Sequence, residues 1–330
     1  MNVWGARREL VGLLMILSLA PALAGDVWAA EEASREGAGK ESSSESEERE
    51  RHPLRARLLG ATPEERERLA AERKRLSETA AAFGTDPTAI VGYYQAGYGH
   101  NAFTSNLRTE TATAVVQLPL TPNWLFRATL PYVWADPNQP RGSTMDGTSD
   151  MTIRTGGRLY ASENVALLIG ADVIFPTAAK TQLGFGKYAL GPGGGLAVPL
   201  PRARSLFFLV VQDFNSVGGD PSRANVHFMQ IQPAINTFWS KHWWTTVQGT
   251  WYMNWNENRR TALNLVGEVG HNFDGHWNVF AGGGVGVVGR DLPFFGLDYT
   301  VQAGVRWVFR TPLIPETFFG GPLGPPASTK

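Results

Sequence analysis

The sequence predicts an all-β protein, a transmembrane, antiparallel, up-and-down β-barrel of about 12 strands with a charged, partly helical N-terminal extension. Three observations predict this class. From Ala89 onward, apolar and polar residues alternate with the period of two that belongs to strands. Aromatic residues gather at the ends of these segments, as they do in the interfacial girdles of membrane barrels. The connections between the segments are alternately long and short.

Residues 1–24 have the features of a secretory signal peptide. Two arginines precede an apolar run that ends at the small-x-small triplet Ala22-Leu23-Ala24. The alternative is an uncleaved anchor, but a membrane helix needs about 20 apolar residues, and Pro21 and Asp26 cut this run short. Because the chain contains no cysteine, a lipid-anchored N-terminal cysteine and a disulfide framework are both excluded.

Residues 25–85 form a charged extension that has too few apolar residues to bury a core. Its first half is expected to be disordered. The stretch "TPEERERLAAERKRLSETAAA" predicts a solvated helix with Thr62 as N-cap and Pro63 in the first turn. An inert tether is the preferred interpretation of this extension, and a plug, a peptidoglycan contact and a partner-binding helix are the alternatives. At the other end of the chain, residues 311–330 are expected to form a Pro/Gly-rich tail.

The barrel itself is predicted over residues 86–310. In "HWWTTVQGTWYMNW", one face carries Trp243, Val247 and Trp251, and the other carries Gln248 and Thr250. A soluble sandwich strand alternates in the same way, but the aromatic strand ends and the alternating connections favour a membrane barrel. The predicted strands are 88–98, 107–119, 122–134, 149–162, 164–176, 187–199, 204–215, 225–239, 242–255, 259–273, 276–288 and 296–309.

An even number of strands places both chain ends on one side of the membrane, which we expect to be the periplasm. The long connections are then expected to face outside, and the protein to lie in the outer membrane of a Gram-negative cell. Closure is expected because hydrocarbon cannot satisfy the amides of an open sheet edge.

Two glycine-rich motifs suggest nucleotide sites, and both interpretations fail. In "FPTAAKTQLGFGKYALGPGGG", Gly186-Lys187 is followed by Tyr188 where a phosphate-binding loop needs a hydroxyl, and Pro192 forbids the helix that should follow. Residues 284–289 satisfy G-x-G-x-x-G, but Pro293 follows and the glycines belong to an alternating strand. No cofactor is expected.

Residues 86–309 resemble the outer-membrane family grouped as the MetA-pathway of phenol degradation. The resemblance is carried by "TATAVVQLPLTPNWLFRATLPYVW", Ser149-Asp150, Phe175-Pro176-Thr177, "LGFGKYALGP" and "IQPAI". Tyr188 departs from the pattern, as do the 21 residues after Phe309. The resemblance implies a transporter-type barrel for aromatic or other hydrophobic compounds.

Neither catalysis nor a metal site is expected. The histidines are scattered, although His100 and His227 lie toward the predicted outside, where they could approach Asp136 or Asp220. The formal net charge of zero gives no sign of nucleic-acid binding. The expected partners are outer-membrane lipids and a small solute, and the oligomeric state stays open.

A barrel of about 12 strands has a narrow bore, because eight strands close over packed side chains and 16 leave an open channel. The residues expected to line it are Arg127, Arg154, Arg158, Asp172, Gln248, Glu268 and Arg306. The inward face of residues 204–215 is undecided, since both faces are apolar.

Asp172 is expected opposite Arg154 across a hairpin. An ion pair is the preferred outcome, and an unpaired Arg158 that orients an anionic or phenolic solute is the alternative. The leading hypothesis is a passive outer-membrane channel or uptake protein for small solutes. A structural or adhesive barrel without transport is the second hypothesis, and an outer-membrane enzyme the third.

Overall fold

The computed structural model describes residues 63–137, 143–162 and 164–309. The predicted signal peptide, the first half of the extension and the C-terminal tail lie outside these residues. The barrel belongs to the compact unit Glu67–Lys330. No helix in the described ranges is long and apolar enough to cross a membrane.

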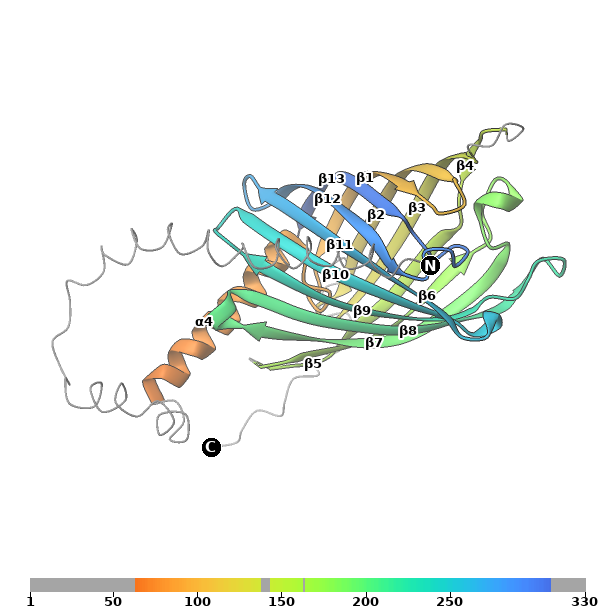
Figure 1. The fold of residues 1–330 in the computed structure, drawn as a ribbon. Coiled ribbons are helices and arrows are strands. Elements are labelled where there is room, and N and C mark those ends of the chain that lie inside the picture. Colours follow the sequence, from red (N-terminus) through yellow and green to blue (C-terminus); the bar gives the residue numbers. More distant parts are fainter. Residues whose placement is uncertain (1–62, 138–142, 163, 310–330) are drawn as a thin grey trace. The chain divides into compact units, whose positions relative to one another are not determined.

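Twelve strands close into an antiparallel barrel, and a thirteenth, short strand extends one wall (Figure 1). Sequence neighbours pair around the ring, and the first strand, β1, also pairs with the last, β13, so that the barrel has no open edge. The strands are β1 (Gly92–Ala102), β2 (Arg108–Thr121), β3 (Trp124–Asp136), β4 (Met145–Thr148), β5 (Met151–Ala161), β6 (Ala166–Phe175), β7 (Lys187–Leu200), β8 (Ser205–Gly219), β9 (His227–Phe238), β10 (Trp243–Asn254), β11 (Arg260–Asn272), β12 (Trp277–Val288) and β13 (Tyr299–Phe309).

The two ends of the barrel differ in their connections. Short turns such as 122–123, between β2 and β3, gather at one end, called here the short-turn end. Longer connections such as 176–186, between β6 and β7, lie at the opposite, long-loop end. Gly92 pairs with Phe309, so the barrel's first and last strands begin and finish together at the short-turn end.

The alternation read in the sequence separates the two faces of the wall. Trp243, Val247 and Trp251 are exposed on the outside, whereas Trp244 on the opposite face of the same strand is fully buried. Most exposed large side chains of the strands are apolar or aromatic, which gives the barrel an apolar outer surface.

The first strand is predicted four residues too early, at 88–98 instead of Gly92–Ala102. The stretch "TAIVGYY" alternates like a strand, but Ala89 and Val91 pack in a buried cluster with Tyr93, Val115 and Val308. The predicted first long loop therefore shrinks to 103–107. The predicted fourth strand, 149–162, is observed as β5, which begins two residues later at Met151, and the short strand β4 lies in the connection predicted before it.

Helix α4 (Pro63–Phe83) begins at the predicted proline, but its last turn is not solvated as expected. Ala80 and Phe83 are buried against inward side chains of the barrel, Phe208, Phe238 and Trp244. The Phe83 ring centroid lies 5.7 Å from that of Phe238 and 6.4 Å from that of Trp244. Residues 80–91, called here the plug segment, therefore enter the barrel.

Candidate functional site: a three-layered lumen

A large chamber lies at the long-loop end of the lumen. Its volume is 650 Å³, and loops 103–107, 176–186 and 289–298 contribute to its wall. The apolar lining residues are Phe103, Leu107, Val133, Ala135, Met145, Ile174, Leu183, Phe185, Leu292, Pro293 and Phe294. The ring centroids of Phe185 and Phe294 are 5.2 Å apart, which joins two of these loops. The chamber is of the size and apolar character typical of small-molecule sites.

The break between β4 and β5 holds loop 176–186 in place over this chamber. The Asp150 carboxylate accepts hydrogen bonds from the backbone N–H groups of Ala178 at 3.1 Å and Phe185 at 2.6 Å. The Ser149 hydroxyl donates to the carbonyl of Leu183 at 2.5 Å. A Cβ at Gly184 would clash with the Asp150 carboxylate, so this glycine permits the close approach.

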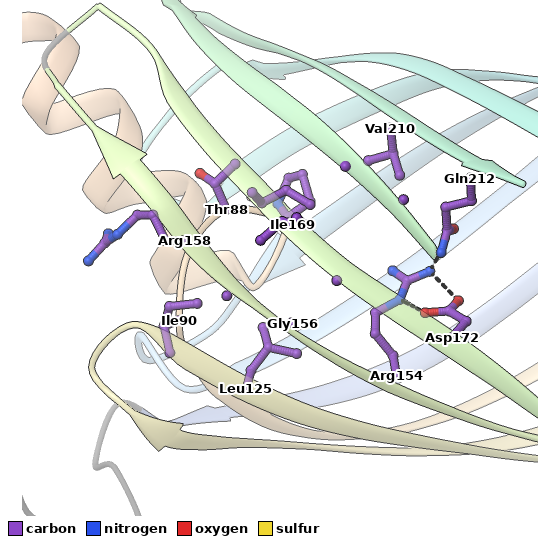
Figure 2. Close-up of a pocket in the computed structure, with 16 residues that line it drawn as sticks. Thr88, Ile90, Leu125, Arg154, Gly156, Arg158, Ile169, Asp172, Val210 and Gln212 are labelled. Atoms are coloured by element: carbon purple, nitrogen blue, oxygen red, sulfur yellow. Dashed lines mark hydrogen bonds and ion pairs between the residues drawn. The ribbon is translucent and has the colours of Figure 1, made fainter. Parts of the chain in front are cut away.

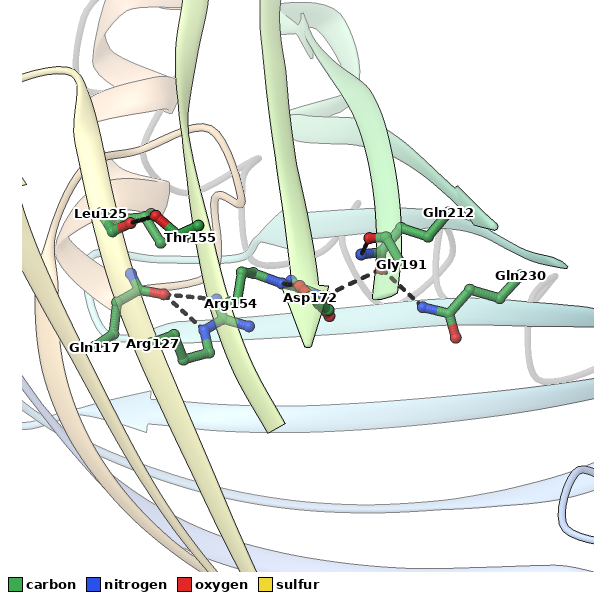
Figure 3. A network of polar contacts seen from close by, with 9 residues as sticks. All are labelled: Gln117, Leu125, Arg127, Arg154, Thr155, Asp172, Gly191, Gln212 and Gln230. Atoms are coloured by element: carbon green, nitrogen blue, oxygen red, sulfur yellow. Dashed lines mark hydrogen bonds and ion pairs between the residues drawn. The ribbon is translucent and has the colours of Figure 1, made fainter. Parts of the chain in front are cut away.

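A second layer of the lumen, called here the polar girdle, runs from strand to strand along the inner wall at mid-lumen. It consists of Gln117, Arg127, Arg154, Asp172, Gln212 and Gln230, on β2, β3, β5, β6, β8 and β9 (Figure 3). The register aligns its members, because Gln117 pairs with Arg127, Arg127 with Arg154, and Arg154 with Asp172 on successive strands.

The expected ion pair between Arg154 and Asp172 is present in this girdle. Arg154 Nε and Nη2 donate to the two Asp172 carboxylate oxygens at 2.6 and 2.7 Å, a bidentate arrangement. Arg154 also donates to Gln212 Oε1 at 3.2 Å, and Gln230 donates to the same oxygen at 2.8 Å. Figure 2 shows Arg154 between Asp172 and Gln212. Asp172 is buried, and the ion pair with Arg154 compensates its charge.

The third layer is a polar cavity of 330 Å³ between the girdle and the plug segment. It is lined by Gly84, Thr85, Asp86, Pro87, Tyr93, Gln117, Arg127, Phe208, Thr246, Gln248, Val266, Glu268, Gln302 and Arg306. Gln302 donates to the Glu268 carboxylate at 3.3 Å, and Arg306 donates to Gln95 Oε1 at 2.8 Å. Arg306 Nη1 also donates to the carbonyls of Phe83 at 3.1 Å and Gly84 at 2.7 Å, which fixes the plug segment.

One further contact joins the plug segment to the barrel, and another lies within the segment itself. Gln117 Nε2 donates to the carbonyl of Val91 at 2.7 Å. The Asp86 carboxylate accepts from the backbone N–H and the hydroxyl of Thr88, at 2.8 and 2.6 Å. Burial raises the pKa of Asp86 above its ordinary value, although the bonds from Thr88 oppose this.

All seven predicted site residues border these inner cavities. Arg127, Gln248, Glu268 and Arg306 line the 330 Å³ cavity. Arg154, Arg158 and Asp172 line a smaller cavity of 50 Å³. Arg158 lies apart from Arg154 (Figure 2). Its Nη2 donates to Asn123 Oδ1 of the β2–β3 turn at 3.2 Å.

Sequence reasoning missed Tyr93, Gln117 and Gln212 as site residues. Gln212 lies on β8, where both faces are apolar, so the sequence pattern could not decide which side faces inward. In the structure Gln212 is buried in the girdle, and the neighbouring Asp213 points outward, where it accepts a hydrogen bond from Trp255. Tyr93 lies within both the predicted and the observed first strand, and its buried, inward face became visible only in the structure.

The two histidines form ion pairs with carboxylates other than those suggested by the sequence. His100 lies 2.8 Å from Glu110, because the two residues pair across β1 and β2, and Asp136 borders the same pocket as His100. His227 lies 3.4 Å from Asp213 rather than near Asp220. In the described part of the chain, no group of three or more His, Asp or Glu side chains could hold a metal ion.

The barrel is similar to solved outer-membrane proteins. An outer-membrane channel from Pseudomonas putida F1 matches with a TM-score of 0.51 and 13% identity, over 68% of this chain and 97% of that one. The NanC porin matches with a TM-score of 0.48 and 11% identity, over 66% and 98%. The Pseudomonas putida toluene transporter TodX matches with a TM-score of 0.36 and 9% identity, over 72% and 93%. No protein-family model and no curated protein sequence matches. At 13% identity, the likeness to the Pseudomonas putida F1 channel shows the fold alone, which is an outer-membrane-type β-barrel.

Proposed function

We propose that this chain is a channel or uptake protein of the Gram-negative outer membrane that lets small apolar or aromatic solutes pass without energy input. The long-loop end faces the outside, both barrel termini face the periplasm, and lipid surrounds the apolar outer wall. The protein is not an enzyme in this proposal, and the motifs quoted above relate it to the MetA-pathway family.

The observation that carries this proposal is the 650 Å³ chamber at the long-loop end. Its wall gathers apolar side chains from strands and three loops, and Phe185 and Phe294 meet there. A polar solute gains little from such a wall, whereas an apolar one is removed from water at about 25 cal/mol per Å² of buried apolar surface. The chamber therefore favours apolar solutes at the entrance of the lumen.

A second candidate function is a structural or adhesive barrel without transport. The plug segment favours it, because Ala80 and Phe83 fill the lumen at the short-turn end. The two candidates differ in conductance. Full-length protein reconstituted in planar bilayers is expected to show single-channel steps, and a complete lack of steps would favour the structural barrel.

The chamber is tested by uptake of an apolar fluorophore, N-phenyl-1-naphthylamine, into intact cells. Cells that produce the wild type are expected to take up the dye faster than cells without the protein. Phe185→Asp places a charge in the chamber and should remove most of this difference. Val217→Asp is the matched control, since Val217 is 68% exposed on β8 and does not line the chamber. Equal uptake by both variants would contradict an entry route through the chamber.

A further inference from the structure

The inward arginines differ in how their charge is compensated. Arg154 pairs with Asp172, Glu268 lies in electrostatic range of Arg306, and Asp86 in that of Arg158. Arg127 has no carboxylate within ion-pair distance among the described residues. Asp172, whose charge also reaches Arg127, is already bound at both oxygens by Arg154. Arg127 is thus a cation without a carboxylate partner of its own.

Neutral neighbours fix the position of the Arg127 guanidinium. Its Nε and Nη2 donate to Gln117 Oε1 at 2.8 and 2.6 Å. Gln117 in turn cannot reverse its amide, because its Nε2 is held by the Val91 carbonyl. The guanidinium carbon lies 5.6 Å from the centre of the Tyr93 ring. A guanidinium has five N–H donors, so Arg127 is held in place and keeps donors for a ligand.

A second guanidinium lies beside the same ring. The Arg306 guanidinium carbon is 5.1 Å from the centre of Tyr93. Two cations beside one ring repel each other, and a bound anion relieves this repulsion. In a protein interior the attraction of an anion to such a pair is stronger than in water.

The 330 Å³ cavity offers room for an anion at this place. Arg127, Arg306 and Tyr93 line it, together with the apolar side chains of Phe208 and Val266. Asp86 and Glu268 line it too, but each lies in range of another arginine, Arg158 or Arg306. A planar carboxylate matches the fork of a guanidinium, and a small ring matches the apolar wall.

We propose that Arg127 binds the carboxylate of a small arene carboxylate, whose ring packs against Phe208 and Val266. This inference rests on the proposed function, since the solute must enter the lumen to reach the cavity. It narrows the class of solutes from apolar compounds in general to those that carry a carboxylate on an aromatic ring.

Benzoate and benzamide are suitable probes, because they share the ring and differ in charge. Equilibrium dialysis of full-length, folded barrel in detergent micelles, corrected for binding to empty micelles, is expected to show benzoate bound at least about tenfold more tightly than benzamide. Arg127→Gln should abolish this preference. Arg202→Gln removes an exposed arginine in the β7–β8 turn, outside the lumen, and should keep it.

Equal binding of benzoate and benzamide to the wild type would overturn the inference, and this comparison needs no variant to fold. Benzoate binding that is not weakened by Arg127→Gln would also overturn the inference. So would displacement of bound benzoate by acetate at the same concentration that unlabelled benzoate requires. Because dialysis measures binding and does not depend on transport, a failure of the proposed binding site can be told apart from a failure of the proposed channel function. Preferential benzoate binding in a protein without conductance supports the site and contradicts the proposed function.

Discussion

The buried pair of Arg154 and Asp172 shows why substituting a single residue in this lumen lowers the stability of the folded barrel. Asp172 is 4% exposed, and both of its oxygens are occupied by Arg154. Removing one partner leaves a charge buried without compensation, which costs more than losing the pair as a whole.

Arg154→Met is therefore expected to destabilise the folded barrel by about 3–5 kcal/mol. Urea unfolding of the barrel in lipid vesicles measures this change. The double variant Arg154→Met with Asp172→Leu is the control and should recover most of the lost stability, since it removes both charges. A double variant no more stable than the single one would show that the buried charge is not the cause.

The two faces of a single strand give a second prediction at the residue scale. Trp251 is 47% exposed on the outer wall, and Gln248 lines the inner cavity. Trp251→Arg puts a charge against lipid and should cost about 2–4 kcal/mol of barrel stability. Gln248→Arg should fold like the wild type, because its face is polar. Heat-modifiable migration in gels reports assembly, and equal assembly of both variants would reverse the assigned faces of β10.

At the scale of elements, helix α4 and the segment after it decide whether the lumen is open. Ala80 and Phe83 anchor the helix among inward side chains, and Arg306 holds the backbone that follows. The Trp244 side chain, which packs against Phe83, has its indole N–H buried with no hydrogen-bond partner. Such groups carry a free-energy cost that hydration would remove. The plugged arrangement is thus held by apolar packing and by the hydrogen bonds from Arg306, and it is opposed by the unsatisfied indole N–H of Trp244.

Phe83→Ser is expected to loosen the plug segment, because truncating a buried Phe to a small residue costs about 3–5 kcal/mol. Single-channel conductance in planar bilayers should rise above that of the wild type. Arg75→Ser changes an exposed position of the same helix and should leave conductance unchanged. If all three proteins conduct equally, the plug segment does not limit permeation.

At the scale of the whole molecule, the alternation of short turns and long loops implies a topology. The proposal places the long-loop end outside the cell and the short-turn end in the periplasm. Ser143 precedes β4 at the long-loop end, and Asp274 lies in the β11–β12 turn at the opposite end. Both positions suit single-cysteine labelling, because the chain has no native cysteine.

An impermeant maleimide is expected to label Ser143→Cys in intact cells. Asp274→Cys should react only after the outer membrane is permeabilised, so each variant controls for the reactivity of the other. Labelling of the cysteine at 274 alone in intact cells would invert the topology.

The sequence by itself determined the barrel, because strand alternation, aromatic strand ends and turn lengths are local features that one chain segment displays alone. The same logic found the Arg154–Asp172 pair, since a hairpin sets its register over few residues. Only the tertiary structure decided the rest. "TAIVGYY" alternates like a strand, yet its first half packs inside the barrel, because closure offers Val91 a buried site that no local pattern reveals. Arg127 also lacks a carboxylate only because barrel closure sets which side chains from distant strands, among them Tyr93 and Arg306, surround it.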